Sequence, residues 1–276
     1  MEAHAINTRS FSIATFNTLG VPFFSSHPTA RFQALCQIFE RLAPDLINLQ
    51  EVHVYNLLAI LKKQLPSYPF IAYERGLLGP RGGLVTLSRS PLARAQFHAS
   101  PSELPPAKNR FLRTLAGIQK GTLITSLANW PLLVYNTHLL ANTDGDWSSD
   151  NRHYPAHVSH LEHLAALITL HASQKTLIIT GDFNIPKCSD LYQQFLTSSQ
   201  ATDVFGSDET STFRSEFLPP NAATHRIDYI FLRSDMRETQ IGKTTTLFQD
   251  PVRLANGKPV FLSDHLGLLA ELVFPL

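Results

Sequence analysis

The chain has 276 residues, of which 43% are hydrophobic and 16% are charged, and its formal net charge is +1. This composition excludes an intrinsically disordered chain, because it supplies enough apolar side chains for a sizeable core. The near-neutral charge lacks the strong positive field on which sequence-independent nucleic-acid binding depends. We expect one domain over residues 1–276, because sheet-rich domains reach this length.

The sequence lacks the usual signals for secretion and membrane insertion. Residues 1–16 contain no basic region followed by an apolar core of secretory length, and no stretch reaches the roughly 18 apolar residues of a membrane span. The two cysteines, Cys36 and Cys188, imply no disulfide framework. We therefore expect a cytoplasmic protein, or one exported without a recognisable signal peptide, with no transmembrane segment and at most peripheral membrane contact.

Short runs of β-branched and aromatic residues between turn signals predict strands, and apolar residues at helical spacing predict helices. The predicted strands cover residues 11–17, 46–51, 83–89, 132–138, 176–182, 226–232 and 266–274, and the predicted helices cover 30–42, 55–65 and 156–171. Pro44 and Pro66 end the first two helices. This order predicts an α/β layered domain with a mixed sheet.

Polar side chains end or interrupt most of these strands. They are Asn17, Glu51, His138, Asp182, Asn184, Asp228, Asp264 and His265. Ligands of open α/β sheets bind at strand ends, where loops present side chains from a rigid base. Carboxylate and amide oxygens suit Mg²⁺, or Mn²⁺ in its place, whereas histidines move protons or donate to anions. Asp182 and Asn184 are two apart, so an extended segment would point both into one cleft.

The motifs around these residues resemble a known family. The stretches ATFNTLG, INLQEV, YNTHL, ITGDFNIP, HRIDYIFL and LSDHLGL occur in this order over nearly the whole chain. Their set is similar to the motifs of the endonuclease/exonuclease/phosphatase superfamily. The resemblance implies a four-layer α/β/β/α fold, in which two packed mixed sheets are flanked by helices, and a divalent-metal phosphoesterase activity in this single domain. We expect the protein to be a monomer.

The same resemblance implies the metal ligands. The carboxylate after "LQ", here Glu51, binds the metal with help from the asparagine of the first strand, here Asn17. Asp264 of "SDH" supports either the metal or the neighbouring histidine. The number of metal ions is left open, and Mg²⁺ is the expected cofactor.

The resemblance also implies the catalytic groups. His265 resembles the general base that activates water, and Asp228 resembles its orienting partner, although Asp182 could share that role. Asp182 and Asn184 would position the nucleophile and the phosphate, and His138 would donate to a phosphoryl oxygen. Such a set suits in-line attack at phosphorus, because a metal neutralises the phosphoryl oxygens while histidine removes the proton of water.

The substrate is read from the variable stretches, and three alternatives stay open. Residues 75–92 are similar to the glycine-rich hairpin of sphingomyelinases, and residues 136–164 resemble their "THL" loop, which favours a lipid headgroup such as that of sphingomyelin. Residues 21–26 and Trp147 could present apolar groups to a lipid interface. A nuclease is the alternative, with these basic residues contacting nucleic acid: Arg75, Arg81, Arg89, Arg94, Lys108, Arg110 and Arg113. A catalytically silent binding protein is the alternative of another class.

Three histidines of the third predicted helix require a separate interpretation. His157, His160 and His163 recur at three-residue spacing, which could indicate a zinc site. No carboxylate or cysteine completes a recognisable zinc motif. We therefore predict surface histidines beside a buried apolar stripe.

Overall fold

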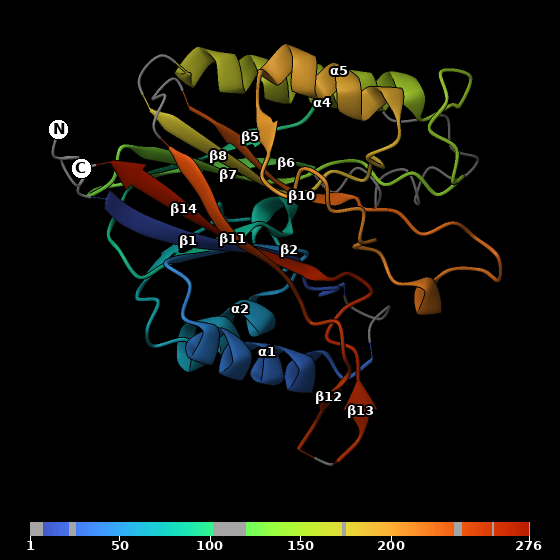
Figure 1. Cartoon of the computed structure of the whole chain (residues 1–276). Helices are drawn as coiled ribbons and strands as arrows, with labels where there is room; N and C mark the ends of the chain where they lie inside the picture. Colours follow the sequence, from blue (N-terminus) through green and yellow to red (C-terminus); the bar gives the residue numbers. More distant parts are fainter. Residues whose placement is uncertain are drawn as a thin grey trace, which may run out of the picture.

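Two six-stranded sheets pack face to face between two pairs of helices (Figure 1). The computed structural model of the chain describes residues 8–21, 26–101, 120–172, 175–234, 239–255 and 257–275. In Figure 1, α1 (Pro28–Leu42) and α2 (Tyr55–Gln64) cover one sheet, and α4 (Tyr154–His171) and α5 (Asp190–Ser199) cover the other. The predicted four-layer α/β/β/α fold is confirmed.

The first sheet combines strands from both ends of the chain. Its order is β11 (Gln240–Leu247), β14 (Gly267–Pro275), β1 (Thr8–Asn17), β2 (Leu46–Gln50), β4 (Val85–Ser88) and β3 (Phe70–Ala72). β1 pairs with β2 in parallel and with β14 antiparallel. A parallel pair needs a crossover, which α1 supplies. The sheet is therefore mixed, as predicted.

The second sheet is built from the middle of the chain. Its order is β5 (Leu92–Ala99), β6 (Gly121–Leu127), β7 (Leu132–His138), β8 (Thr176–Asp182), β10 (Asp228–Arg233) and β9 (Thr202–Asp203). β7 and β8 are parallel, with α4 as their crossover, and the other neighbours are antiparallel. A hairpin of β12 (Val252–Arg253) and β13 (Pro259–Val260) and two short 3-10 helices, η1 (Arg81–Gly83) and η2 (Ser215–Phe217), complete the described elements.

Three apolar clusters separate the four layers, and the alternation of β8 shows how. Leu177 and Ile179 belong to the cluster under α4 and α5, whereas Ile178 belongs to the cluster between the sheets. A strand that is buried on both faces has a continuous apolar sequence, which is why the run before Asp182 contains no polar alternation. A third cluster, which includes Phe32 and Phe39, packs α1 and α2 on the first sheet.

The layer between the sheets becomes polar toward one end of the strands. Asn48 Nδ2 donates to Thr180 Oγ1 at 2.8 Å, and Gln50 Nε2 donates to Asn136 Oδ1 at 2.8 Å. Both hydrogen bonds join the first sheet to the second. Buried polar groups are tolerated when they are paired in this way. They fix the register of the two sheets next to the residues that follow.

One predicted strand begins later than expected. Residues 83–89 were predicted as a strand, but β4 starts at Val85, because Gly82 and Gly83 have φ of 66° and 68°. These left-handed dihedrals form the 3-10 turn η1 instead of extended backbone.

Candidate active site

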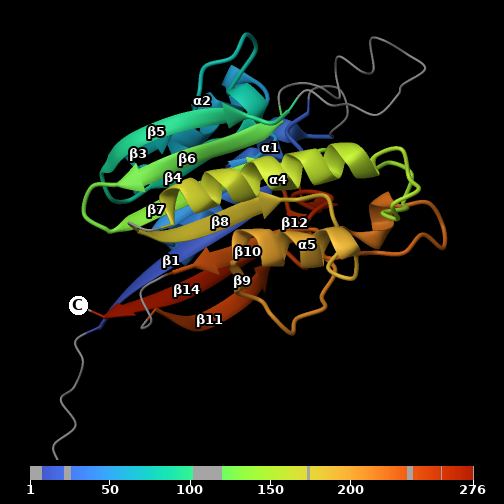
Figure 2. The same ribbon diagram turned by 90° about the horizontal axis from the view of Figure 1, so that it is seen from above.

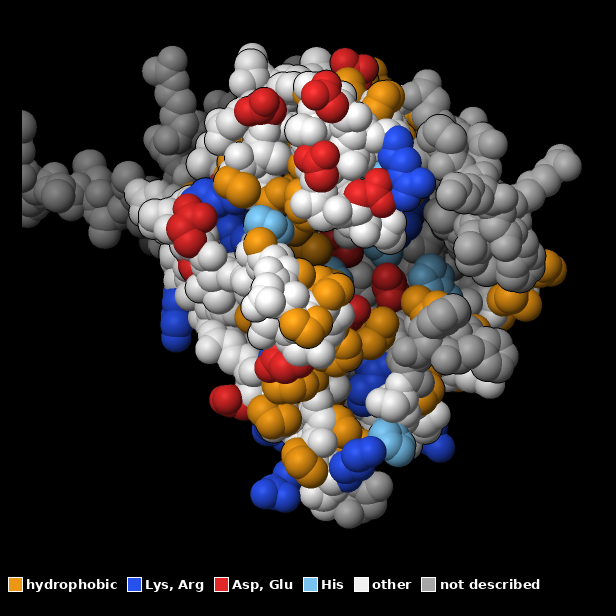
Figure 3. All heavy atoms as spheres, turned by 90° about the vertical axis from the view of Figure 1, so that its right-hand side faces the viewer, with side chains coloured by type: hydrophobic (Ala, Val, Ile, Leu, Met, Phe, Trp, Pro, Cys, Tyr) orange, Lys and Arg blue, Asp and Glu red, His pale blue; other side chains and the backbone are white. Residues whose placement is uncertain are grey.

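The eight polar residues predicted from the sequence lie at one end of the two sheets, which we call the shared edge. The first sheet brings Asn17, Glu51, Asp264 and His265 there, and the second brings His138, Asp182, Asn184 and Asp228. The two sets touch, because Asn17 Nδ2 donates to Asp182 Oδ2 at 3.0 Å. Figure 3 looks onto this face and shows acidic and histidine side chains at its centre, between apolar side chains.

His265 links the two sheets through its imidazole. Its Nδ1 lies 2.8 Å from Asp228 Oδ2, and its Nε2 lies 3.7 Å from Asp182 Oδ2. All three side chains are buried. Asp228 therefore holds the hydrogen bond to Nδ1, whereas Asp182 faces the other nitrogen at a longer distance. Of the two aspartates considered from the sequence, Asp228 is the one that contacts Nδ1.

Asp228 is itself held in place by the chain around it. Its backbone N–H donates to Thr212 Oγ1 at 3.0 Å, and Phe213 packs edge-on against the His265 ring at 5.0 Å between centroids. Thr212 and Phe213 come from the segment between β9 and β10. They fix the orientation of the His265–Asp228 pair.

Glu51 sits in a left-handed turn directly after β2. Its φ is 62°, which is uncommon for a residue with a Cβ. A Cβ on Gly20 would lie 2.2 Å from the Glu51 carbonyl oxygen, and a Cβ on Gly83 would lie 2.9 Å from Glu51 Cα. Glycine at these two positions allows the chain to pack closely around Glu51. The constrained backbone aims the Glu51 carboxylate into the shared edge.

Lys120 is a site residue that the sequence reasoning missed. It directly precedes β6, and its Nζ donates to His138 Nε2 at 2.5 Å. Because an ammonium group only donates, His138 Nε2 is the acceptor and carries no proton in this arrangement. In this contact the proton lies on Lys120 and not on His138 Nε2, where the sequence had predicted a donor.

Asn184 reaches the site by a different route from the one predicted. β8 ends at Asp182, and Asn184 has a φ of 54°, so the segment is a turn and not an extended strand. The Asn184 backbone N–H donates to Asp182 Oδ1 at 3.0 Å, and its Nδ2 donates to the Leu139 carbonyl at 3.1 Å. The assumption of strand alternation was wrong. The turn places Asn184 beside the residue that follows His138.

Two buried arginines fasten the loops of the site. Arg31 donates to the carbonyls of Thr18, Leu19 and Leu262, which connects the loop after Asn17 to the loop before Asp264. Arg214 Nε donates to the Ser263 carbonyl at 3.1 Å. Both guanidinium groups thus hold the segment that carries Asp264 and His265.

Burial and charge shift the pKa of most groups at the shared edge. Burial raises the pKa of Glu51 and of Asp182. Burial lowers the pKa of Lys120 to about 8, against the attraction of Glu51 and Asp182. For His265 burial alone would lower the pKa, but Asp228 and Asp182 outweigh it and raise the pKa. Burial therefore makes the ionised carboxylates of Glu51 and Asp182 costly, and Lys120 and His265 offset only part of that cost.

The donor atoms fit a hard divalent cation. Glu51 Oε2 is buried and has no hydrogen-bond partner among the described residues. Asp182 supplies carboxylate oxygens nearby, Asn17 presents its side-chain amide to Asp182 Oδ2, and oxygen ligands are those that Mg²⁺ prefers. Ligand atoms of Asp182, Asp228 and His265 also lie within 4.8 Å of one another. In this group Asp228 Oδ2 already contacts His265 Nδ1 at 2.8 Å.

The histidines of α4 contradict their predicted exposure. His157 and His160 are buried, with exposed fractions of 0% and 2%, so the prediction of surface histidines was wrong for both. Both ring nitrogens of His157 lack a hydrogen-bond partner in the described part of the chain. Burial lowers the pKa of His157 to about 3, so the ring is neutral. It acts as a core side chain.

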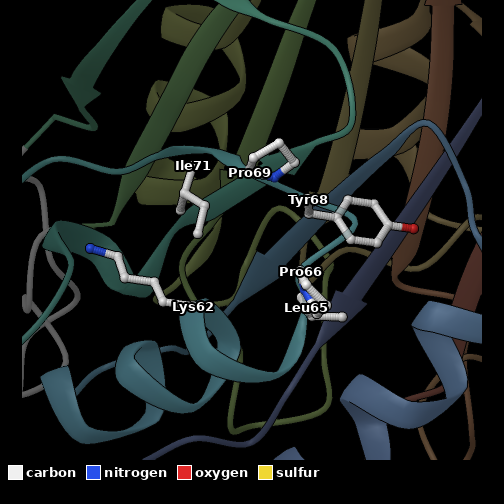
Figure 4. Close-up of a pocket in the computed structure, with 6 residues that line it drawn as sticks. All are labelled: Lys62, Leu65, Pro66, Tyr68, Pro69 and Ile71. Carbon is white, nitrogen blue, oxygen red and sulfur yellow. The ribbon is translucent and has the colours of Figure 1, made fainter.

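One hollow of the described chain lies apart from the shared edge. It has a volume of ≈ 470 Å³ and lies between α2 and β3, with the following lining residues (Figure 4): Lys62, Leu65, Pro66, Tyr68, Pro69 and Ile71. It includes none of the eight predicted residues. We assign the chemistry to the shared edge.

The sequence pattern of the Endonuclease/Exonuclease/phosphatase family matches residues 14–265. The chain belongs to this family. The match runs from β1 to His265 and so includes every predicted site residue. None of the helices that the structure describes is both long and apolar enough to span a bilayer.

Two curated proteins similar to this chain are named as sphingomyelinases. The chain is 25% identical over 95% of its length to "Putative neutral sphingomyelinase" of Drosophila melanogaster, covering 60% of that protein. It is 27% identical over 92% of its length to "Sphingomyelinase" of Mycobacterium tuberculosis, covering 51% of it. The chain thus spans between half and two thirds of the length of these relatives.

Solved structures of other proteins share the fold. Sphingomyelinase C from Streptomyces griseocarneus superposes with a TM-score of 0.70 at 16% identity, covering 95% of this chain and 99% of that one. D. rerio TDP2, complexed with single strand DNA product, gives a TM-score of 0.72 at 18% identity, covering 95% and 98%. At such identities the likeness shows the fold alone.

Proposed function

We propose that the protein is a divalent-metal-dependent phosphodiester hydrolase in which His265 is the general base. The observation that carries the proposal is the 2.8 Å contact between His265 Nδ1 and Asp228 Oδ2. A carboxylate on Nδ1 fixes the tautomer that leaves Nε2 free to accept a proton. Nε2 faces the shared edge, where Asp182 lies.

Glu51 and Asn17 would hold the metal, and Asp264 would support it from the half-buried loop before His265. The unpartnered Glu51 Oε2 supports this assignment. A bound Mg²⁺ would supply positive charge that neutralises phosphoryl oxygens and lowers the pKa of His265 toward the range of a base.

The remaining residues bind and orient the substrate. A water oxygen bonds to phosphorus as the bond to the leaving alcohol breaks, and His265 Nε2 takes the proton of the water. Lys120 Nζ lies beside His138 Nε2 in the site. From this position it would donate to a phosphoryl oxygen of the substrate. Asp182 and Asn184 position the water and the phosphate, joined by the hydrogen bond from the Asn184 backbone.

A choline-type phospholipid such as sphingomyelin is the favoured substrate. The names of the curated relatives support this choice. Of the arginines proposed for the nuclease alternative, two lie away from the site. Arg89 follows β4, and Arg94 lies in β5 near its pairing with Ser126, both toward the end of the strands opposite the shared edge. Lys108, Arg110 and Arg113 lie outside the described residues.

A substrate comparison tests the proposal. Mg²⁺-dependent hydrolysis is measured on sphingomyelin vesicles, single-stranded DNA, duplex DNA and bis(p-nitrophenyl) phosphate, with the wild type and His265→Ala. The proposal expects turnover of sphingomyelin that the variant loses. If the wild type cleaves DNA and the variant does not, the same residues would instead be those of a nuclease. If the wild type is inactive on every substrate, the result would favour a binding protein.

A further inference from the structure

Two of the three most exposed large apolar side chains of the described residues belong to one hairpin. Leu77 is 95% exposed and Leu78 is 72% exposed, in residues 75–80, which we call the leucine hairpin. Tyr55 is 37% exposed, and its hydroxyl donates to the Gly76 carbonyl at 2.7 Å. The described residues include seven exposed large apolar side chains, and three of them, Tyr55, Leu77 and Leu78, adjoin one another. Adjoining apolar side chains of this kind mark interaction surfaces, whereas isolated ones are ordinary.

The leucine hairpin holds these side chains outward by its own hydrogen bonds. Gly76 N–H donates to the Gly79 carbonyl at 3.0 Å, and Arg75 and Pro80 form an antiparallel bridge. The Tyr55 backbone N–H donates to the Leu78 carbonyl at 3.1 Å. A Cβ on Gly79 would lie 2.3 Å from the His53 carbonyl oxygen, so the hairpin packs directly on the backbone of His53. The exposure of Leu77 and Leu78 is thus built into the fold.

The hairpin adjoins the shared edge. His53 and Tyr55, on which it packs, follow Glu51 by two and four residues. At its other end the chain continues to Gly83, whose carbonyl accepts from the Val52 N–H at 2.9 Å. Figure 2 shows the segment between β3 and β4 projecting beyond α2, away from the body of the sheets.

We propose that the leucine hairpin inserts Leu77 and Leu78 into the surface of a phospholipid bilayer and so brings the shared edge to the lipid headgroups. This inference rests on the proposed function, because a lipid phosphodiester lies in such a surface. A convex tip of two leucines suits insertion into acyl chains, which need no complementary groove. Tyr55 has the apolar ring and polar tip of interfacial residues, and the exposed Arg75 favours the lipid phosphates.

Vesicle sedimentation with matched variants tests the docking. Vesicles of phosphatidylcholine and sphingomyelin in equal parts are mixed with the wild type, with the double variant Leu77→Asp and Leu78→Asp, and with Leu170→Asp. Leu170 is the control, since it is also 72% exposed but lies at the end of α4 that leads to the start of β8, opposite the shared edge. Binding is expected to fall at least about a hundredfold in the double variant, roughly tenfold per leucine, and to be unchanged in Leu170→Asp.

A soluble substrate separates this inference from the proposed function. The double variant should hydrolyse bis(p-nitrophenyl) phosphate like the wild type while losing turnover of vesicles. Equal vesicle binding by the wild type and the double variant, or no binding by the wild type, would overturn the docking. A wild-type dimer that the double variant converts to a monomer would also overturn it, by assigning the hairpin to a second copy. Wild-type inactivity on every substrate would refute the proposed function, while sedimentation would still decide the docking.

Discussion

Asn17 Nδ2 donates a 3.0 Å hydrogen bond to Asp182 Oδ2, which joins the end of β1 to the end of β8 across the two sheets. The same Asp182 oxygen lies 3.4 Å from His138 Nε2 and 3.7 Å from His265 Nε2. One carboxylate thus connects the proposed metal side of the site to both histidines. The burial of this carboxylate raises its pKa, and the first prediction depends on that cost.

Mg²⁺ should stabilise the folded protein through Glu51. Burial raises the pKa of Glu51 and Asp182, so a cation that binds them relieves an electrostatic cost of folding. At a hundredfold excess over its dissociation constant, a ligand specific for the folded state adds about 2.7 kcal/mol to the free energy of unfolding. Thermal unfolding with Mg²⁺ and with EDTA measures this gain. Glu51→Gln should remove most of it, and an unchanged gain in that variant would place the metal elsewhere.

Asp228→Asn should impair turnover far more than substrate binding. The new amide can donate to His265 Nδ1, which would put the ring proton on Nε2 and remove the base. We expect kcat to fall by about 10² to 10⁴ with little change in KM, the range for loss of a general base. The double variant with His265→Ala should be no worse than His265→Ala alone, because the two residues act as a unit. Additive losses would contradict a role of Asp228 through His265.

Lys120→Met should reduce kcat/KM by roughly tenfold to a hundredfold, the worth of a charged hydrogen bond. Lys120→Arg should retain more activity, since it keeps a donor and a charge near His138. Steady-state kinetics on one substrate compares the two, with circular dichroism to confirm folding. A Lys120→Met enzyme as active as the wild type would exclude Lys120 from phosphate binding.

Gly181→Ala should destabilise the fold by about 2–4 kcal/mol, from overpacking and backbone strain together. A Cβ at this position would lie 1.9 Å from the Thr137 carbonyl oxygen, and the φ of Gly181 is 140°. Gly145→Ala is the control, because its φ is 70° but nothing lies within 4 Å of an added Cβ. Urea unfolding of both variants separates packing from strain, and equal losses would refute the packing explanation.

His157 should make the protein less stable as the pH falls. Burial, then His160 and His153, lowers its folded pKa from 6.5 to about 3. Below pH 6.5 the unfolded chain therefore binds a proton that the folded chain excludes, and stability decreases on acidification. At pH 5 this costs about 2 kcal/mol, from roughly 1.4 kcal/mol per pH unit. His157→Leu should gain that amount relative to the wild type between pH 7 and 5. A difference between the two proteins that does not change with pH would contradict the shift.

The sequence could predict the site residues that directly follow a recognisable buried strand. The apolar run before Asp182 and the run before His138 identify buried strands, and a polar side chain at such an end faces a cleft. Lys120 escaped this reasoning because it precedes its strand. Only the antiparallel pairing of β6 with β7 brings the start of β6 to the shared edge, and strand pairing is a non-local property.

The failures have local causes as well. The turn at Asn184 depends on a left-handed residue, which a rule of extended alternation does not include. The burial of His157 depends on the packing of α4 in its layer, whereas helical spacing alone identified only the apolar stripe. Of the apolar stretch at 21–26, residues 22–25 lie outside the described chain. Trp147 is half-buried and its Nε1 donates to the Asn184 carbonyl at 2.9 Å, which ties it to the site.

Hydrolysis of bis(p-nitrophenyl) phosphate by the wild type and by His265→Ala, each with Mg²⁺ and with EDTA, tests the central claim most directly. This substrate needs no lipid surface and no nucleic-acid groove, so it reports the shared edge alone. We predict turnover by the wild type that requires Mg²⁺ and falls by about 10² to 10⁴ in the variant. Equal turnover by the two proteins, or turnover that persists in EDTA, would contradict metal-dependent hydrolysis with His265 as the base.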